Sequence, residues 1–332
     1  MPILLLAALA ACGGKSSPPV QSFKNPVYPT DFPDPFVLKV GKTYYAYATS
    51  PSGGGANIPE LRSRDLVHWK ESGDALPIPA LWPDKFYAPG VTQLSDGTYV
   101  MYYTGHDPNV GQAGAECLGV AGSKSPAGPF KDSSHKPFLC QVGEGGTIDP
   151  DVLRDGGNLY LYFKNDGNCC GIPTYIYAQK LSPDGRWLVG TRVRLVHNDK
   201  IWERDVVEAP TMWKHDGRYY LFFSGSHWDT PYYAVGYATC QGPMGPCKEA
   251  PENPILQYHA GGCNAEGPGG QTIVEDATGQ TWMLYHAWLG DSTSYDVQGQ
   301  RALWLDRLDW KDGKPVIHGP TCKAEPGPAT ST

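Results

Sequence analysis

The stretch that decides the fold is WERDVVEAPTMWKHDGRYYLFFSG, residues 202–225. It contains two runs rich in β-branched and aromatic residues, and an Asp216-Gly217 turn separates them, which predicts a β-hairpin. Glu208 stands in an apolar and aromatic setting shortly before Pro210. Because burial disfavours the charged form of a carboxyl group, such a glutamate is a candidate proton donor near neutral pH.

The same unit of strand, turn and strand recurs along the chain. It starts at residues spaced by roughly sixty positions, namely Pro35, Pro89, Pro150 and Pro210, with Gly269 continuing the series as a fifth. Each unit also has room for two more short strands. We therefore predict an all-β protein, a five-bladed β-propeller with four antiparallel strands per blade. A β-sandwich or a pair of β domains is the alternative, and the regular period argues against it.

Composition narrows the class of protein further. Of the 332 residues, 18% are charged and 12% aromatic, so the chain is neither disordered nor a coiled coil. The 40 glycines and 31 prolines predict many turns and few long helices. A formal net charge of -7, without a basic stripe, gives no electrostatic footprint for nucleic acid and fits a neutral substrate. We expect a monomer.

The amino terminus predicts export. An apolar run over residues 3–10 leads into Leu9-Ala10-Ala11-Cys12, which resembles the lipobox of bacterial lipoproteins, where the cysteine carries the lipid. The run lacks a preceding Lys or Arg and is too short to span a membrane as a mature helix, and an ordinary secretory peptide is the alternative. We expect a lipoprotein signal peptide (1–11), a flexible tether (12–24), one propeller domain (25–322) and a flexible tail (323–332). The protein is then anchored to the cell envelope through Cys12, its only membrane contact, or secreted.

Eight more cysteines follow Cys12, and an even number in an oxidising compartment predicts disulfides. Cys240 and Cys247 flank a turn-rich loop, which makes them the best single pair. Cys169 and Cys170 are adjacent, and because a ring between neighbours is strained, we expect each to have a separate partner. Zinc is the rival interpretation, but the sequence lacks paired Cys-x-x-Cys spacings.

The repeat predicts that carboxylates converge. In a propeller the first strand of each blade lines the central channel, and the residue before each proline lies at the start of that strand. Those positions hold Asp34, Ala88 and Asp149, while Glu208 stands one residue further back in the fourth unit. Each acid alone is typical of a turn or cap. Three from three blades are hard to explain structurally, since like charges crowded together cost stability.

These residues resemble glycoside hydrolase family 43. The resemblance covers about residues 25–320 and rests on Asp34-Pro35 after Asn-Pro-Val, on Ile148-Asp149-Pro150 and on Val207-Glu208-Ala209-Pro210. It implies a five-bladed propeller that cleaves arabinose- or xylose-containing polysaccharides with inversion. Asp34 would be the general base, Glu208 the general acid, and Asp149 the residue that tunes and orients the acid. Inversion needs the two carboxyls roughly 6.5–9.5 Å apart to admit a water molecule. A nucleophilic Asp34 with retention is the alternative.

Two later residues also resemble family positions, and both are candidate substrate contacts. Arg301 resembles a late-blade arginine that contacts the general base, with a surface turn arginine as the alternative. His286 resembles a histidine that helps hold a hydrated calcium or other ion in the channel of many members, with a hydrogen-bonded structural histidine as the alternative. Calcium prefers six to eight oxygen ligands, so waters would supply most of them. We expect that no cofactor is required.

Aromatic residues near the predicted pocket are candidates for sugar binding, namely Tyr87, Phe86 and Trp228. Family members often have Trp-Ala-Pro-Asp in blade two, whereas this chain has Tyr87-Ala88-Pro89-Gly90 and lacks that acidic contact. The predicted activity is cleavage of α-L-arabinofuranosyl linkages in plant cell-wall arabinan or arabinoxylan. A β-xylosidase or a galactan-cleaving member is the alternative within the family. A non-catalytic, surface glycan-binding propeller is the alternative outside enzymes.

Overall fold

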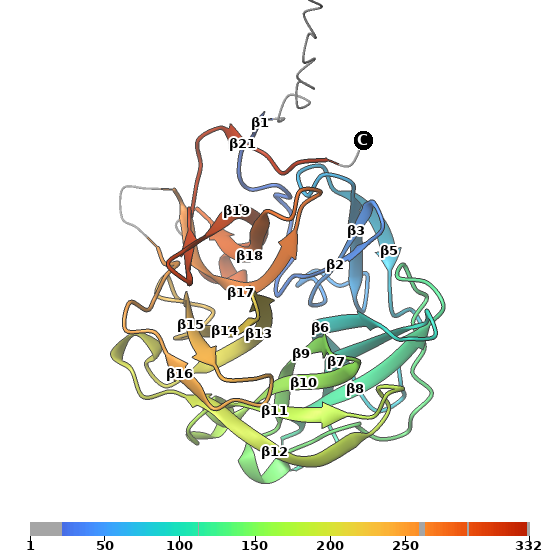
Figure 1. The fold of residues 1–332 in the computed structure, drawn as a ribbon. Coiled ribbons are helices and arrows are strands. Elements are labelled where there is room, and N and C mark those ends of the chain that lie inside the picture. Colours follow the sequence, from blue (N-terminus) through green and yellow to red (C-terminus); the bar gives the residue numbers. More distant parts are fainter. Residues whose placement is uncertain (1–21, 112, 259–262, 291, 331–332) are drawn as a thin grey trace, which may run out of the picture.

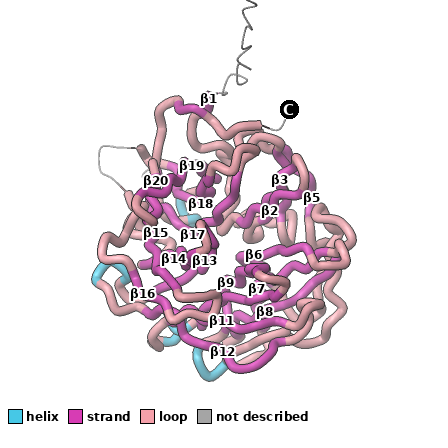
Figure 2. Tube along the Cα trace, in the orientation of Figure 1, coloured by secondary structure: helices cyan, strands magenta, loops and turns pink. Residues whose placement is uncertain are grey.

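The computed structural model describes residues 22–111, 113–258, 263–290 and 292–330. Cys12, the predicted signal peptide and most of the predicted tether lie outside these residues. In the described part of the chain, no helix is long and apolar enough to cross a membrane. Its helices are single 3-10 turns between long stretches of strand and loop (Figure 2), namely η1 (Val142–Glu144), η2 (Gly167–Cys170), η3 (Ile201–Glu203) and η4 (Tyr295–Val297).

Five antiparallel sheets follow one another around a common centre (Figure 1). The first sheet contains β2 (Phe36–Val40), β3 (Thr43–Tyr47), β4 (Pro59–Ser63) and β5 (Lys70–Asp74). The second contains β6 (Lys85–Gln93), β7 (Tyr99–Asp107) and β8 (Ala115–Ser123). Single bridges from Lys131 and Leu139 to β8 occupy the outer edge of this second sheet.

The remaining three sheets have four strands each. The third contains β9 (Thr147–Asp155), β10 (Asn158–Asn165), β11 (Tyr175–Leu181) and β12 (Leu188–His197). The fourth contains β13 (Val207–His215), β14 (Arg218–Gly225), β15 (Ala234–Cys240) and β16 (Cys247–Glu249). The fifth contains β17 (Ala265–Glu275), β18 (Thr281–Leu289), β19 (Arg301–Lys311) and β20 (Lys314–Ile317).

The first strands of the sheets form a closed inner ring, because β2, β6, β9, β13 and β17 each contact the next and β17 contacts β2. Apolar side chains fill the spaces between neighbouring sheets. Leu221 and Phe223 of β14, for example, pack with Ile176 and Ala178 of β11. The predicted five-bladed β-propeller is therefore confirmed. Its core is a set of interfaces between blades, which leaves the centre free for polar residues.

The backbone is strained where each inner strand approaches the centre. Positive φ angles occur at Asp34 (50°), Ala88 (39°), Asp149 (58°), Ala209 (49°) and Gly270 (59°). A residue before proline normally adopts an extended conformation, and a non-glycine residue in this region costs about 1–3 kcal/mol. In β6, β9, β13 and β17 the strand pairing shifts register at the same point, as in a β-bulge. Such bulges re-aim side chains beside functional sites.

The fifth repeat is one place where the predicted phase was wrong. The series of residues with positive φ continues at Gly270, so Gln271 takes the position that proline has in the other four inner strands. The sequence instead suggested Gly269, because this unit has three glycines and one proline within residues 267–270, and the sequence does not show which of them takes the positive φ. The glutamine side chain reaches the neighbouring fourth blade, since Nε2 of Gln271 donates to the backbone carbonyl of Ala209 at 2.7 Å.

The ring is closed by the segment before β2, which lies along β19. The side-chain amide of Asn25 makes both bonds to the backbone of Leu305. Its Nδ2 donates to the carbonyl at 2.8 Å, and its Oδ1 accepts the N–H at 2.9 Å. Beyond it, β1 (Ser22–Phe23) pairs with β21 (Glu325–Pro326). The sequence predicts a tether up to residue 24 and a tail from residue 323. The structure instead gives residues 22–23 and 325–326 a shared two-stranded sheet, and Ala329 hydrogen-bonds with Ala277.

Four disulfides lie within the described residues. The predicted Cys240–Cys247 bond is confirmed and joins β15 to β16. The prediction that Cys169 and Cys170 have separate partners is wrong, because they are bonded to each other in η2, where the chain makes a tight 3-10 turn. The others are Cys117–Cys140 and Cys263–Cys322.

Candidate active site

A cavity of about 430 Å³ opens at one end of the central channel. This volume lies within the range of about 300–1,000 Å³ that is typical of small-ligand sites. Its wall brings together the three carboxylates that the repeat predicts, Asp34, Asp149 and Glu208. They come from the starts of the first, third and fourth inner strands. The other residues of the wall are Thr49, Ser50, Ser52, Tyr87, Glu116, Ile148, Lys164, Asp166, Asn168, Trp228, Tyr295 and Arg301.

Asp34 is held by donors on two sides. Oγ1 of Thr49 donates to Oδ2 of Asp34 at 2.6 Å, and Nη1 of Arg301 lies 3.4 Å from Oδ1. Thr49 is itself oriented, because its Oγ1 accepts the backbone N–H of Ala88 at 2.9 Å. The positive φ at Asp34 and these donors together fix the carboxylate toward the cavity.

Arg301 is buried at the start of β19, although the sequence left a surface turn open as an alternative. Its guanidinium lies 4.5 Å from the centre of the Trp228 ring, and its Nε donates to the hydroxyl of Tyr295 at 2.9 Å. The backbone N–H of Arg301 and the Tyr295 hydroxyl both donate to Asp31. The arginine is therefore clamped before any ligand binds, and it presents a fixed positive charge to Asp34.

Asp149 and Glu208 lie on the third and fourth blades, which are adjacent to each other. Oδ2 of Asp149 accepts the backbone N–H of Ala209 at 2.9 Å, which fixes Asp149 beside the strand that carries Glu208. Burial and repulsion from the charge of Glu208 raise the pKa of Asp149 to about 8. Asp149 therefore retains a proton at neutral pH, beside the strand that carries Glu208. A retained proton is what an acid catalyst in this position needs.

A buried lysine that sequence reasoning missed completes the charge balance. Nζ of Lys164 donates to Oε2 of Glu208 at 2.9 Å and lies 3.5 Å from Oδ1 of Asp166. Burial by itself would lower the pKa of Lys164, but the carboxylates of Glu208, Asp166 and Asp149 raise it to about 12. The one available signal in the sequence was its position, because Lys164 directly follows the apolar strand run Leu159–Phe163.

His286 lies beneath Asp34, buried and stacked on Tyr233 at 5.7 Å between ring centres. Burial lowers the pKa of His286 well below its ordinary value, with Arg301 adding to the effect, so the ring is neutral. Its Nδ1 accepts the backbone N–H of Asp34 at 3.0 Å, which places the ring proton on Nε2. Nε2 is buried and has no hydrogen-bond partner among the described residues.

This arrangement does not fit a calcium ion bound directly by His286. A metal ligand must offer a lone pair, whereas Nε2 carries the proton and can only donate. Water in the channel would satisfy this N–H. The geometry fits the alternative of a hydrogen-bonded histidine that positions the backbone of Asp34.

The predicted sugar contacts divide into two groups. Tyr87 and Trp228 line the cavity, and Trp228 is 37% exposed, so its ring is available for stacking on a sugar. Phe86 does not fit the prediction. Its side chain is buried in the hydrophobic core against Tyr103, because successive residues of β6 point to opposite faces and Tyr87 takes the cavity side.

Glu116 is a second wall residue that the sequence did not reveal. It belongs to β8, and the Cys117–Cys140 bond fixes the neighbouring position. Burial raises the pKa of Glu116 to about 7, and its Oε2 has no hydrogen-bond partner among the described residues. A buried acceptor without a partner beside a cavity is suited to a ligand hydroxyl. No sequence pattern marked it, since an isolated glutamate after Ala115 is common at a surface.

Fold and site together define a carbohydrate-cleaving propeller, with paired acids at the mouth of its channel. The sequence matches the model of the glycosyl hydrolases family 43 over residues 23–315, and the chain belongs to this family of inverting glycosidases. It is similar to a β-D-galactofuranosidase, xynD, of Aspergillus niger, with 26% identity over 88% of this chain and 84% of that protein.

Two further similarities agree with this assignment. A probable arabinan endo-1,5-α-L-arabinosidase C of Aspergillus flavus is 27% identical over 82% of this chain and 87% of that protein. The crystal structure of a thermostable family-43 glycoside hydrolase superposes with a TM-score of 0.82 and 30% identity, covering 93% of this chain and all of that one. The resemblance inferred from three short sequence patterns is confirmed across nearly the whole fold.

Proposed function

We propose that this glycosidase hydrolyses α-L-arabinofuranosyl linkages in plant polysaccharides of the arabinan or arabinoxylan type. The observation that carries the proposal is the asymmetry of the three carboxylates in one cavity. Asp34 is surrounded by the donors Thr49 and Arg301, which suits a base that begins the reaction ionised. The raised pKa of Asp149 keeps a proton beside Glu208, which suits an acid.

The proposed reaction uses the two sides of the cavity at once. A water molecule beside Asp34 attacks the anomeric carbon and gives its proton to the Asp34 carboxylate. On the opposite face of the sugar ring, Glu208 gives its proton to the glycosidic oxygen as the bond between that oxygen and the anomeric carbon breaks. The product has the inverted configuration, and a proton returns from Asp34 to Glu208 through solvent.

Asp149 and Lys164 position the acid in this proposal and do not touch the substrate. Asp149, with its raised pKa, keeps a proton beside Glu208, and the backbone N–H of Ala209 fixes its orientation. Lys164 holds the Glu208 carboxylate at 2.9 Å and limits the excess of negative charge. Arg301 has the corresponding positioning role at Asp34.

The preference for a furanoside is supported by the similarities with the arabinosidase of Aspergillus flavus and the galactofuranosidase of Aspergillus niger. α-L-Arabinofuranose and β-D-galactofuranose have the same configuration around the five-membered ring and differ in the exocyclic chain. A site built for one ring therefore suits the other. This makes a galactofuranoside the second candidate substrate, ahead of the β-xylosides that a related pocket would also accommodate.

The test is hydrolysis of aryl α-L-arabinofuranoside, β-D-galactofuranoside and β-D-xyloside, followed by debranched arabinan and arabinoxylan. Arabinose release that disappears in Glu208→Gln supports the proposal, and proton NMR should show the inverted anomer first. Activity on xylosides alone would replace the proposed sugar while leaving the enzyme class intact. Binding without cleavage on every substrate would favour a glycan-binding propeller.

We further propose that the protein is exported and anchored through a lipid on Cys12. Four disulfides are typical of proteins that fold in an oxidising compartment. Labelling cells with an alkyne fatty acid should mark the wild-type protein and leave Cys12→Ser unlabelled. Equal labelling of both would contradict the anchor.

A further inference from the structure

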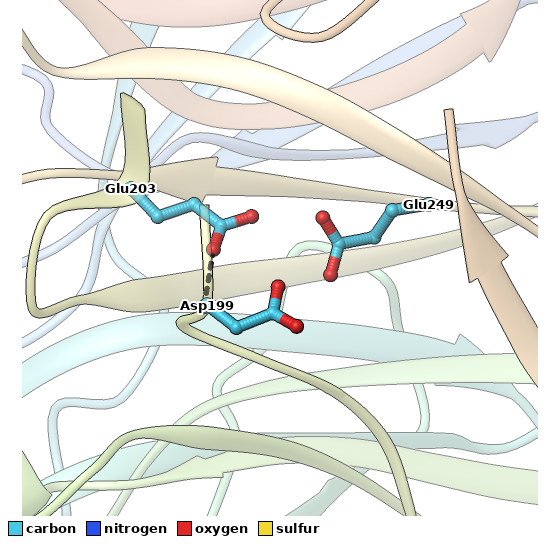
Figure 3. A group of neighbouring side chains, drawn as sticks. All are labelled: Asp199, Glu203 and Glu249. Carbon is cyan, nitrogen blue, oxygen red and sulfur yellow. Dashed lines mark hydrogen bonds between the residues drawn. The ribbon is translucent and has the colours of Figure 1, made fainter. Parts of the chain in front are cut away.

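Three carboxylates meet on the outer side of the fourth blade, away from the cavity. Asp199 lies between β12 and η3, Glu203 ends η3, and Glu249 ends β16. One oxygen of each carboxylate lies within 4.8 Å of the corresponding oxygens of the other two. Figure 3 shows the three side chains reaching from separate segments toward one centre.

Glu203 is the buried member of this acidic cluster, and it is only half satisfied. Its side chain is 0% exposed, and its Oε2 accepts the backbone N–H groups of Asp199 and Lys200, both at 2.8 Å. Oε1 is buried, faces Glu249 and has no hydrogen-bond partner among the described residues. Oε2 of Glu249 is likewise buried and has no hydrogen-bond partner among the described residues. Buried carboxylate oxygens without partners are costly, so their presence indicates a missing positive group.

The protein's own cations leave most of this charge unbalanced. The ammonium of Lys200 pairs with Asp199, and Nε2 of His197 lies 3.7 Å from the same side chain. Within the described residues, Glu203 and Glu249 have no ion pair with a lysine or arginine. The carboxylates of Glu203 and Glu249 therefore face each other, whereas the ammonium of Lys200 pairs with Asp199.

We propose that Asp199, Glu203 and Glu249 bind a calcium ion. Calcium takes oxygen ligands at about 2.3–2.6 Å, so two ligands on opposite sides of the ion lie up to roughly 4.8 Å apart. The observed oxygen spacing falls within that limit. The side chain of Asp199 is 40% exposed, which leaves one side of the site open to the waters that complete six to eight ligands.

The ion would brace the segment that leads to Glu208. The carbonyl of Glu203 accepts the backbone N–H groups of Val206 and Ser226, which joins η3 to the loop after β14. The Cys240–Cys247 bond in turn holds β16, the strand of Glu249. Calcium at the cluster thus ties β12, η3 and β16 together a few residues before β13 begins. The site is separate from the channel and from His286.

A proton shared by Glu203 and Glu249 is the rival explanation for the same contacts. A cluster that needs only a proton would not respond to calcium at any pH.

The experiment measures the thermal midpoint of the chelator-stripped protein at pH 8 without metal, with 10 mM CaCl2 and with 10 mM MgCl2. Extracellular calcium modules have dissociation constants up to about 1 mM, so saturation should raise the midpoint by about 3 °C or more. We expect the rise with calcium in the wild-type protein and no rise in Glu249→Gln. Asp216→Asn, a change in an 89% exposed side chain, is the matched control and should keep the full response.

Isothermal titration of the wild-type protein with CaCl2 gives an independent answer that does not depend on how the variant folds. The proposal predicts one calcium site per protein molecule at pH 8. An equal midpoint rise in Glu249→Gln, or the lack of calcium binding by the wild-type protein in the titration, would overturn it. The second result would support the shared proton.

Discussion

Replacing Lys164 by methionine removes the ammonium that lies between two active-site carboxylates. Its Nζ is 2.9 Å from Oε2 of Glu208 and 3.5 Å from Oδ1 of Asp166, and the side chain is 1% exposed. At an effective dielectric constant of about 20, attraction over the shorter distance amounts to ~6 kcal/mol. Desolvation of the buried ions offsets much of this, so removing one partner should cost about 3–5 kcal/mol of unfolding free energy.

For a domain of this size the cost corresponds to a fall in thermal midpoint of roughly 10 °C. The matched control is Lys214→Met, since Nζ of Lys214 lies 2.6 Å from Asp155 but its side chain is 40% exposed. Water already screens that pair, so its loss should lower the midpoint by about 2 °C or less. Differential scanning calorimetry of both variants and the wild type measures the difference.

The same substitution should move the pH dependence of catalysis. Lys164 lowers the pKa of Asp149, which stands at about 8, so loss of the ammonium raises that pKa further. The proton that Asp149 keeps beside Glu208 is then retained to higher pH. The basic limb of kcat/KM should shift upward by roughly one pH unit. Equal midpoint losses in the two lysine variants, or an unmoved basic limb, would refute the charge balance inferred for this site.

Three other predictions concern the walls of the cavity. Asp149→Asn removes the carboxyl that keeps a proton beside Glu208, so kcat should fall by about 10²-fold and the basic limb should move to lower pH; an unchanged pH profile would contradict this role. Arg301→Lys keeps the charge but loses the stacking on Trp228, and kcat/KM should fall by about 10–100-fold, whereas a near-normal value would show that the clamp is dispensable. Glu116 has a pKa of about 7, so Glu116→Gln should change KM for oligosaccharides at pH 8 more than at pH 6, and equal effects at both pH values would argue against a charged contact.

The fold could be predicted because one local feature, a residue with a positive φ directly before a proline, repeats along the chain. Proline at a spacing of roughly sixty residues marks each of the first four inner strands, and the structure shows why. The residue before it adopts a positive φ, as at Asp34 and Asp149, and turns its side chain toward the axis. The fifth unit lacks the proline, so its phase could be fixed only from the backbone at Gly270.

The three carboxylates could be predicted for the same reason, while their partners could not. Lys164 and Glu116 come from second and third strands of blades, where the sequence has no repeated signal and a single charged residue looks like a surface residue. Their significance depends on burial and on distance to other charges. The bond between Cys169 and Cys170 could not be predicted either. An argument from ring strain excludes such a bond, but the bond forms within the local turn of η2.

The most direct test of the account compares Glu208→Gln and Asp34→Asn on two arabinofuranosides, one with a 2,4-dinitrophenyl leaving group and one with an alkyl leaving group. If Glu208 is the acid, its variant should lose about 10²–10⁴-fold on the alkyl glycoside, which needs a proton, and far less on the dinitrophenyl glycoside, which does not. Asp34→Asn should lose a similar large factor on both, because water must still be activated. Equal losses for the two leaving groups in Glu208→Gln, or near-normal turnover of the alkyl glycoside, would contradict the assignment of Glu208 as the proton donor.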